Sequence, residues 1–113
     1  MKIVVKITLP ELKEMLPNFF GDMVKAVVDV ERKLVALDAQ LHVDLEQSLL
    51  ENGSKQSDLW GINFYPDFFG NENFVEFDSM INVRPSHGNS SRNVESEEIR
   101  KKIIAITTKA IQQ

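Results

Sequence analysis

The sequence predicts an α+β fold in two layers, a mostly antiparallel sheet with helices packed on one face. Apolar and polar residues alternate along several short segments, which is typical of strands with one buried side. Other segments repeat their apolar residues at helical spacing and carry helix-capping residues. The chain has 113 residues, enough for one hydrophobic core. We therefore expect a single domain spanning residues 1–113.

The chain begins with a predicted strand over residues 2–7, where apolar residues alternate mainly with lysines. A short helix follows. Thr8 and Glu11 have the spacing of a capping box, and Pro10 is tolerated in a first helical turn. Pro17 is expected to end this helix.

Residues Met23 to Leu41 admit two interpretations. Valines and alanines alternate with other residues on both sides of the polar run Glu31–Lys33. The enrichment in β-branched residues favours a β-hairpin. The turn lacks glycine, however, and one long helix would also keep most of the apolar residues together, so the helix stays open as the alternative.

The middle of the chain is predicted to hold a helix and two strands. The helix begins at His42 or Asp44 and ends at Gly53, because glycine suits the left-handed residue that follows a helix. The strands cover Trp60–Tyr65 and Phe74–Arg84, with a long glycine-containing connection between them.

The last predicted element is a helix from Val94 to Ile111, with isoleucines at helical spacing. Glu95, Glu97 and Glu98 lie at its start, and basic residues follow, as the helix dipole prefers.

The composition excludes several classes of protein. No stretch is long and apolar enough to span a bilayer, and the charged N-terminal segment is unlike a signal peptide. The net charge of −4 argues against sequence-independent nucleic-acid binding. The chain has no cysteine, which excludes disulfides and thiolate chemistry. We therefore expect a cytoplasmic protein that binds neither membranes nor nucleic acid.

The segment from Arg84 to Arg92 carries the strongest functional signal. It holds two arginines, a histidine, an asparagine and three serines. Arginine forks bind carboxylate or phosphate, and Gly88 would let the backbone approach a ligand. This composition indicates a site for a small anion.

A structural role for the same loop is the alternative. Three glutamates follow immediately and would repel a phosphate. Arg84 and Arg92 would then bind these glutamates or backbone carbonyls and pin the loop. The sequence leaves both interpretations open.

A polar face is expected beside this loop. On the predicted strand Phe74–Arg84, Glu76, Asp78 and Asn82 share one side, which Asn63 of the neighbouring strand can join. Gathered carboxylates would offer oxygen ligands to calcium or magnesium, or an acid–base pair. The alternative is a solvated sheet face. No calcium-loop spacing is present, so no metal or other cofactor is expected.

His42 and His87 are the only histidines. Either could act as a general base or a metal ligand, but no motif joins them, and surface or hydrogen-bonded structural roles are the alternative. No local pattern marks a serine as a nucleophile.

Aromatic residues are concentrated between Trp60 and Phe69. Most of them are expected in the core. Phe68 and Phe69 lie in a predicted loop and could instead form a contact patch, so a homodimer through this loop or a sheet edge is a further hypothesis.

Four runs of the sequence carry a resemblance to a known family: Phe20–Asp29, Leu41–Asp44, Gly53–Pro66 and Phe77–Pro85. They resemble a family of small bacterial proteins catalogued as a domain of unknown function, over about residues 8 to 106. The resemblance implies a small soluble single-domain protein. It brings no activity, substrate or catalytic residue with it.

Three hypotheses about function follow. The first is a module that binds a small anionic ligand or an acidic group of a partner. Its predicted ligand-binding residues are Arg84, His87, Asn89, Ser90, Ser91, Arg92, Asn82, Asn63 and Asp58. The second is a non-catalytic interaction or homo-oligomerisation module that uses the Phe68–Phe69 loop. The third is a metal-dependent hydrolase built on Glu76, Asp78 and His87.

Overall fold

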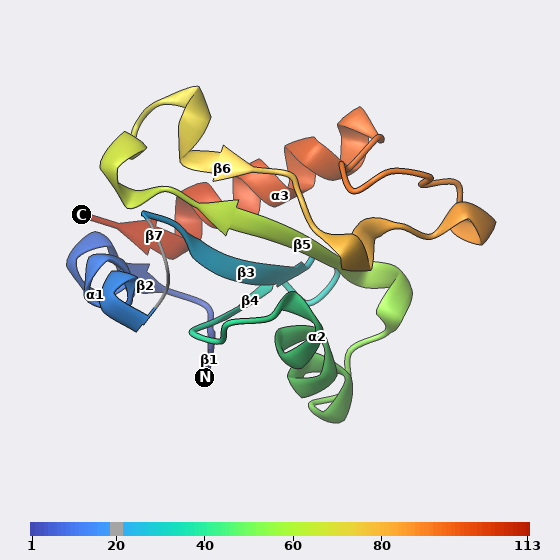
Figure 1. The fold of residues 1–113 in the computed structure, drawn as a ribbon, viewed down its shortest axis with the longest axis horizontal. Helices are drawn as coiled ribbons and strands as arrows, with labels where there is room; N and C mark the ends of the chain where they lie inside the picture. Colours follow the sequence, from blue (N-terminus) through green and yellow to red (C-terminus); the bar gives the residue numbers. More distant parts are fainter. Residues whose placement is uncertain (19–21) are drawn as a thin grey trace.

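A five-stranded antiparallel sheet forms the centre of the protein (Figure 1). The structure is a computed structural model that describes residues 1–18 and 22–113. The strands lie in the order β1 (Lys2–Val4), β4 (Leu34–Leu37), β3 (Val24–Asp29), β5 (Leu59–Phe64) and β6 (Val75–Glu76). A separate parallel pair joins β2 (Ile7–Thr8) to β7 (Ile111–Gln112), close to the two ends of the chain. The α+β class and the antiparallel sheet are confirmed.

The hairpin interpretation of residues 23–41 is confirmed, because β3 and β4 pair in antiparallel register. The turn needs no glycine since Asp29 closes it, accepting hydrogen bonds from the backbone of Glu31 and Arg32 at 2.9 and 2.8 Å. Lys33 supplies the left-handed residue, with a φ of 58°. The β-branched residues of both strands are buried in the centre of the sheet.

The three α-helices of the described residues are α1 (Leu9–Glu14), α2 (His42–Glu51) and α3 (Glu97–Ala110). Thr8 and Glu11 form the predicted capping box at the start of α1. Gly53, with a φ of 105°, follows α2 as expected. Its backbone N–H bonds the Leu50 carbonyl, while that of Ser54 bonds Leu49, which is the Schellman arrangement.

The helices lie on both faces of the sheet, and in this detail the structure corrects the expectation of one covered face. Val28 and Val35 pack with α1 and α3 in one apolar cluster. Val27 and Ala36, which point to the opposite face, pack with α2 in a second cluster. Figure 1 shows α2 and α3 on opposite sides of the strands. The cause is visible in β3 and β4, whose residues are apolar on both sides.

The predicted strand Phe74–Arg84 is wrong beyond Glu76. The chain leaves the sheet after β6 and crosses over β5, with a 3₁₀ turn at Met80–Asn82. Gly61 makes this crossing possible, since a Cβ there would lie 2.4 Å from the Cβ of Ser79. Asn82 is fully buried and hydrogen-bonded to β5 instead of pointing to a solvated face.

Within residues 1–18 and 22–113, no helix has the length and apolar character needed to cross a membrane.

Candidate functional site

The Arg84–Arg92 loop closes on itself as a tight turn. The backbone groups of Arg84 and Asn89 pair across it, with the Arg84 nitrogen 2.7 Å from the Asn89 oxygen. A 3₁₀ turn at Pro85–His87 leads to Gly88, whose φ of 82° favours glycine. His87 is exposed at the tip of this turn.

The Arg84 guanidinium points into the protein. Its Nε donates to the carbonyl of Ile81 at 2.9 Å, and its Nη1 to that of Gln56 at 2.9 Å. Nη2 donates to the Leu59 carbonyl. The guanidinium carbon also lies 4.7 Å from the centroid of the Trp60 ring, a cation–π contact. Burial lowers the pKa of Arg84. All three nitrogens are thus used internally, which favours the structural interpretation for this arginine.

Two buried asparagines hold the rest of the segment. The Asn82 carboxamide accepts from the backbone N–H of Gly61 at 2.8 Å and donates to the carbonyl of Gly61 at 3.0 Å. The Asn89 carboxamide donates to the carbonyls of Asn82 and Asn93, at 2.8 and 2.7 Å, and accepts from the Glu95 backbone. Both predicted site residues therefore make internal hydrogen bonds at buried positions.

Ser90 and Ser91 both donate to the Glu95 carboxylate. The Ser90 backbone nitrogen lies 3.0 Å and the Ser91 hydroxyl 2.6 Å from Oε2 of Glu95. The Ser91 hydroxyl is the main cause that lowers the pKa of Glu95. The carboxylate of Glu95 thus binds Ser90 and Ser91, the two serines that were predicted to bind an external anion.

Arg92 stays half-exposed, unlike Arg84 and Asn89 of the same loop. Its Nε and Nη2 donate to the two carboxylate oxygens of Asp78, at 2.7 and 3.3 Å. Nη1 makes no hydrogen bond to any residue that the structure describes. Arg92 therefore keeps donors available beside an exposed ion pair.

Asn63 and Glu76 are brought together, as predicted. The Asn63 amide and the Tyr65 hydroxyl both donate to Oε1 of Glu76, at 2.9 and 3.0 Å. Among the described residues, no three histidine or carboxylate side chains gather closely enough to hold a metal ion. This grouping gives no support to the hydrolase hypothesis.

Two predicted site residues, Asp58 and His87, lie apart from the group formed by Asn63, Tyr65 and Glu76. Asp58 precedes β5 and its carbonyl accepts from Val30 at 3.0 Å. It is five residues from Asn63 along an extended strand, or about 16 Å. His87 sits on the exposed tip of the loop.

A small pocket opens beside Arg92. It has a volume of about 200 Å³ and lies between the start of α2 and the crossing segment after β6. Lys25, His42, Ser79 and Arg92 line it together with apolar side chains, and none of its described lining residues carries a carboxylate. Lys25 and Arg92 thus line one cavity, and the Lys25 ammonium donates to the carbonyl of Gln40 at 2.8 Å.

His42 lines this pocket, and its surroundings lower its pKa. Its Nε2 is 2.8 Å from the carbonyl of Ile62, and because a carbonyl only accepts, this nitrogen carries a proton. Burial is the main cause that lowers the pKa of His42, and Lys25 acts in the same direction. The Ile62 bond, Asn63 and Asp78 oppose them. Oδ1 of Asn63, beside this ring, is buried without a well-formed hydrogen bond.

The first turn of α2 borders the pocket, and its one acidic residue, Asp44, does not line it. Leu41 stands at the N-cap and makes no side-chain capping bond. The free backbone N–H groups of a helix start carry a partial positive charge. Leu41, His42 and Val43 all line the pocket.

Neither Lys25 nor Ser79 is predicted as a site residue from the sequence, and His42 is a candidate there only as a lone histidine. Spacing could not reveal the pocket, because β3, α2 and the crossing segment meet there only in the fold. One local signal was available: the helix starting at His42 lacks Ser, Thr, Asp or Asn at its N-cap.

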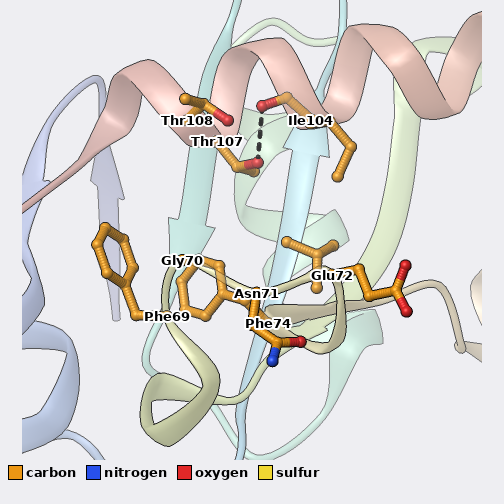
Figure 2. A pocket seen from close by; sticks show the side chains of 9 residues that line it. Phe69, Gly70, Asn71, Glu72, Phe74, Ile104, Thr107 and Thr108 are labelled. Carbon is orange, nitrogen blue, oxygen red and sulfur yellow. Dashed lines mark hydrogen bonds between the residues drawn. The ribbon is translucent and has the colours of Figure 1, made fainter.

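A second, larger pocket of about 330 Å³ lies between α3 and the loop Phe69–Val75 (Figure 2). Phe69 and Phe74 meet edge to face, with centroids 5.2 Å apart. The Thr107 hydroxyl donates to the Ile104 carbonyl, as the dashed line shows, and the Glu72 carboxylate points away from the rings. The carboxylate of Glu72 is thus turned outward, so the pocket offers apolar surface but no group of charges that point into it.

Fold and site together define a small α+β protein with a cationic pocket at the start of its second helix. The chain belongs to the family described as "Protein of unknown function (DUF5674)", which it matches over residues 1–110. The resemblance to a domain of unknown function is thereby confirmed. A search of the curated proteins and a search of the solved structures find no match to this chain.

Proposed function

We propose that the chain binds a small anionic ligand in the pocket between the start of α2 and Ser79, with Arg92 and Lys25 as the binding cations. The observation that carries the proposal is the convergence of both cations and the uncapped α2 start on a cavity whose described lining holds no carboxylate. The arginine loop therefore contributes one cation, Arg92, while Arg84 supports it from inside.

The size of the pocket limits the ligand. A volume of about 200 Å³ holds about six or seven non-hydrogen atoms, at roughly 30 Å³ each. Inorganic phosphate or a short carboxylic acid is of this size. Arg92 would bind one end through its unused Nη1, and the backbone N–H groups of α2 would bind an oxygen on the opposite side.

Equilibrium unfolding in urea, with and without phosphate, tests this proposal. A ligand that binds only the folded protein raises its stability by RT ln(1 + [L]/Kd). We expect phosphate, at constant ionic strength, to raise the urea midpoint of the wild type. Arg92→Gln and Lys25→Gln should each reduce that gain.

Lys101→Gln is the matched control, because Lys101 is exposed on α3 and does not line the pocket. It should keep the full phosphate effect. Equal gains in all four proteins would show a general salt effect and would contradict the site.

Self-association through Phe68 is the second candidate. Phe68 is 44% exposed, whereas Phe69 packs on Phe74 and belongs to the core. Light scattering across a concentration series tests it: Phe68→Ser should lower the mass of any oligomer, and a monomer at every concentration would contradict it.

A further inference from the structure

A third pocket, which we call the lysine groove, lies on the side of the molecule formed by α3 and the N-terminal strands. Its volume is about 230 Å³. Val5, Ala105 and Ile106 form its walls together with the stems of lysines. Val5, at the bend between β1 and β2, is 63% exposed.

Three lysines surround this groove: Lys6 before β2, Lys33 in the β3–β4 turn and Lys109 near the end of α3. None of their ammonium groups forms an ion pair or hydrogen bond with another residue in the described ranges 1–18 and 22–113. The groove surface is almost entirely apolar, so the lysines contribute methylene groups to the walls and keep their ammonium groups at the rim.

Lys33 occupies a backbone position that does not suit it. Its φ of 58° is left-handed, a conformation that glycine adopts without the steric cost a Cβ brings. Glycine would therefore complete the hairpin turn better than lysine. What lysine adds at this position is a cation at the rim of the groove.

From these observations we infer that the lysine groove binds a short amphiphilic carboxylate, with its apolar chain against Val5 and Ile106 and its carboxylate among the three ammonium groups. The volume of about 230 Å³ corresponds to about eight non-hydrogen atoms, at roughly 30 Å³ each. Hexanoate has this size and both chemical features. The groove is independent of the pocket at His42, since the two share no lining residue.

Titration with hexanoate, followed by the backbone amide signals in NMR spectra, tests the inference. We expect shifts at Val5, Lys6, Ala105 and Ile106 that saturate in the millimolar range, as befits so small a ligand. Hexanol, which lacks the charge, and acetate, which lacks the chain, should bind several-fold more weakly. Equal binding of hexanol and hexanoate would contradict the role of the lysines.

Lys33→Gly separates binding from folding. It should weaken hexanoate binding about two- to fivefold, the range of an exposed ion pair, while raising the urea midpoint because the backbone strain is relieved. Lys109→Gln should weaken binding to a similar extent. Lys13→Gln, on the exposed side of α1, is the control and should leave binding unchanged.

Two further outcomes would overturn the inference. One is an absence of saturable shifts with hexanoate. The other is lysine-dependent binding to vesicles of anionic phospholipid without any binding of hexanoate, which would make the groove a membrane contact instead. A lower urea midpoint in Lys33→Gly would remove Lys33 from the site, because it would show that its side chain supports the fold.

Discussion

Arg84 and Arg92 stand at the two ends of one polar loop, yet the fold uses them in opposite ways. Arg84 turns inward, where three backbone carbonyls and the Trp60 ring surround its guanidinium. Arg92 stays 54% exposed and pairs with the 42% exposed carboxylate of Asp78 at the mouth of a pocket. An arginine-rich loop is therefore not by itself an anion site, because burial and existing hydrogen bonds decide which guanidinium can bind a ligand.

The largest effect is expected from Arg84→Met. Methionine keeps much of the volume but leaves the carbonyls of Ile81, Gln56 and Leu59 without their donor. We expect the free energy of unfolding to fall by about 2–4 kcal/mol. Arg92→Met should cost only about 0–1 kcal/mol, because its ion pair is exposed. Urea unfolding measures both, and equal costs would remove the distinction between the two arginines.

Gly61→Ala tests how the loop is held against the sheet. The added methyl group would lie 2.4 Å from the Cβ of Ser79, so the crossing segment must move away from β5. We expect a loss of about 1–3 kcal/mol. Gly70→Ala is a useful control because no atom lies within 4 Å of its Cβ position, although its φ of 89° still makes alanine strained. A tolerated Gly61→Ala would contradict the close crossing.

The pH dependence of stability tests the state of His42. Burial lowers its pKa below the ordinary value of 6.5, so the unfolded chain binds a proton at a pH where the folded protein does not. Stability from this group is therefore complete above about pH 7.5 and falls as the pH drops through 6.5. In phosphate-free buffer, the loss between pH 7.5 and 5 should be smaller in His42→Gln. Identical profiles would contradict a lowered pKa of His42.

The smallest effect is expected from Asp78→Asn. This substitution should strengthen the binding of phosphate, whereas the substitutions above should lower the stability of the fold. Asp78 holds two nitrogens of Arg92 and competes with an external anion. Its neutral replacement should tighten phosphate binding about two- to fivefold, the worth of an exposed ion pair. Calorimetric titration would measure the change, and weaker binding would show that Asp78 positions Arg92 for the ligand.

Local signals predicted much of the fold. The capping box at Thr8, the glycine after α2 and the alternating valines of the hairpin each depend on near neighbours in the sequence. The predicted strand does not continue beyond Glu76, and the reason is non-local. The Asn82 side chain accepts a hydrogen bond from the backbone of Gly61, 21 residues away in the sequence.

The candidate site was less accessible to sequence reasoning. The inward turn of Arg84 depends on carbonyls 25 and 28 residues away. The pocket joins Lys25, His42 and Arg92 from three separate elements. The composition indicates a polar loop with two arginines. Only the fold shows that Arg84 uses its donors inside the protein, whereas Arg92 keeps one nitrogen without a hydrogen bond to the described residues.

The most direct test of the account is a phosphate titration of the wild type at constant ionic strength, followed by backbone amide NMR signals. We predict saturable shifts concentrated at His42, Val43, Ser79 and Arg92, with the tip of the loop from Pro85 to Gly88 unchanged. Shifts centred on that tip, or uniform shifts across the protein, would contradict the assignment of Arg92 to a binding site and of Arg84 to the fold.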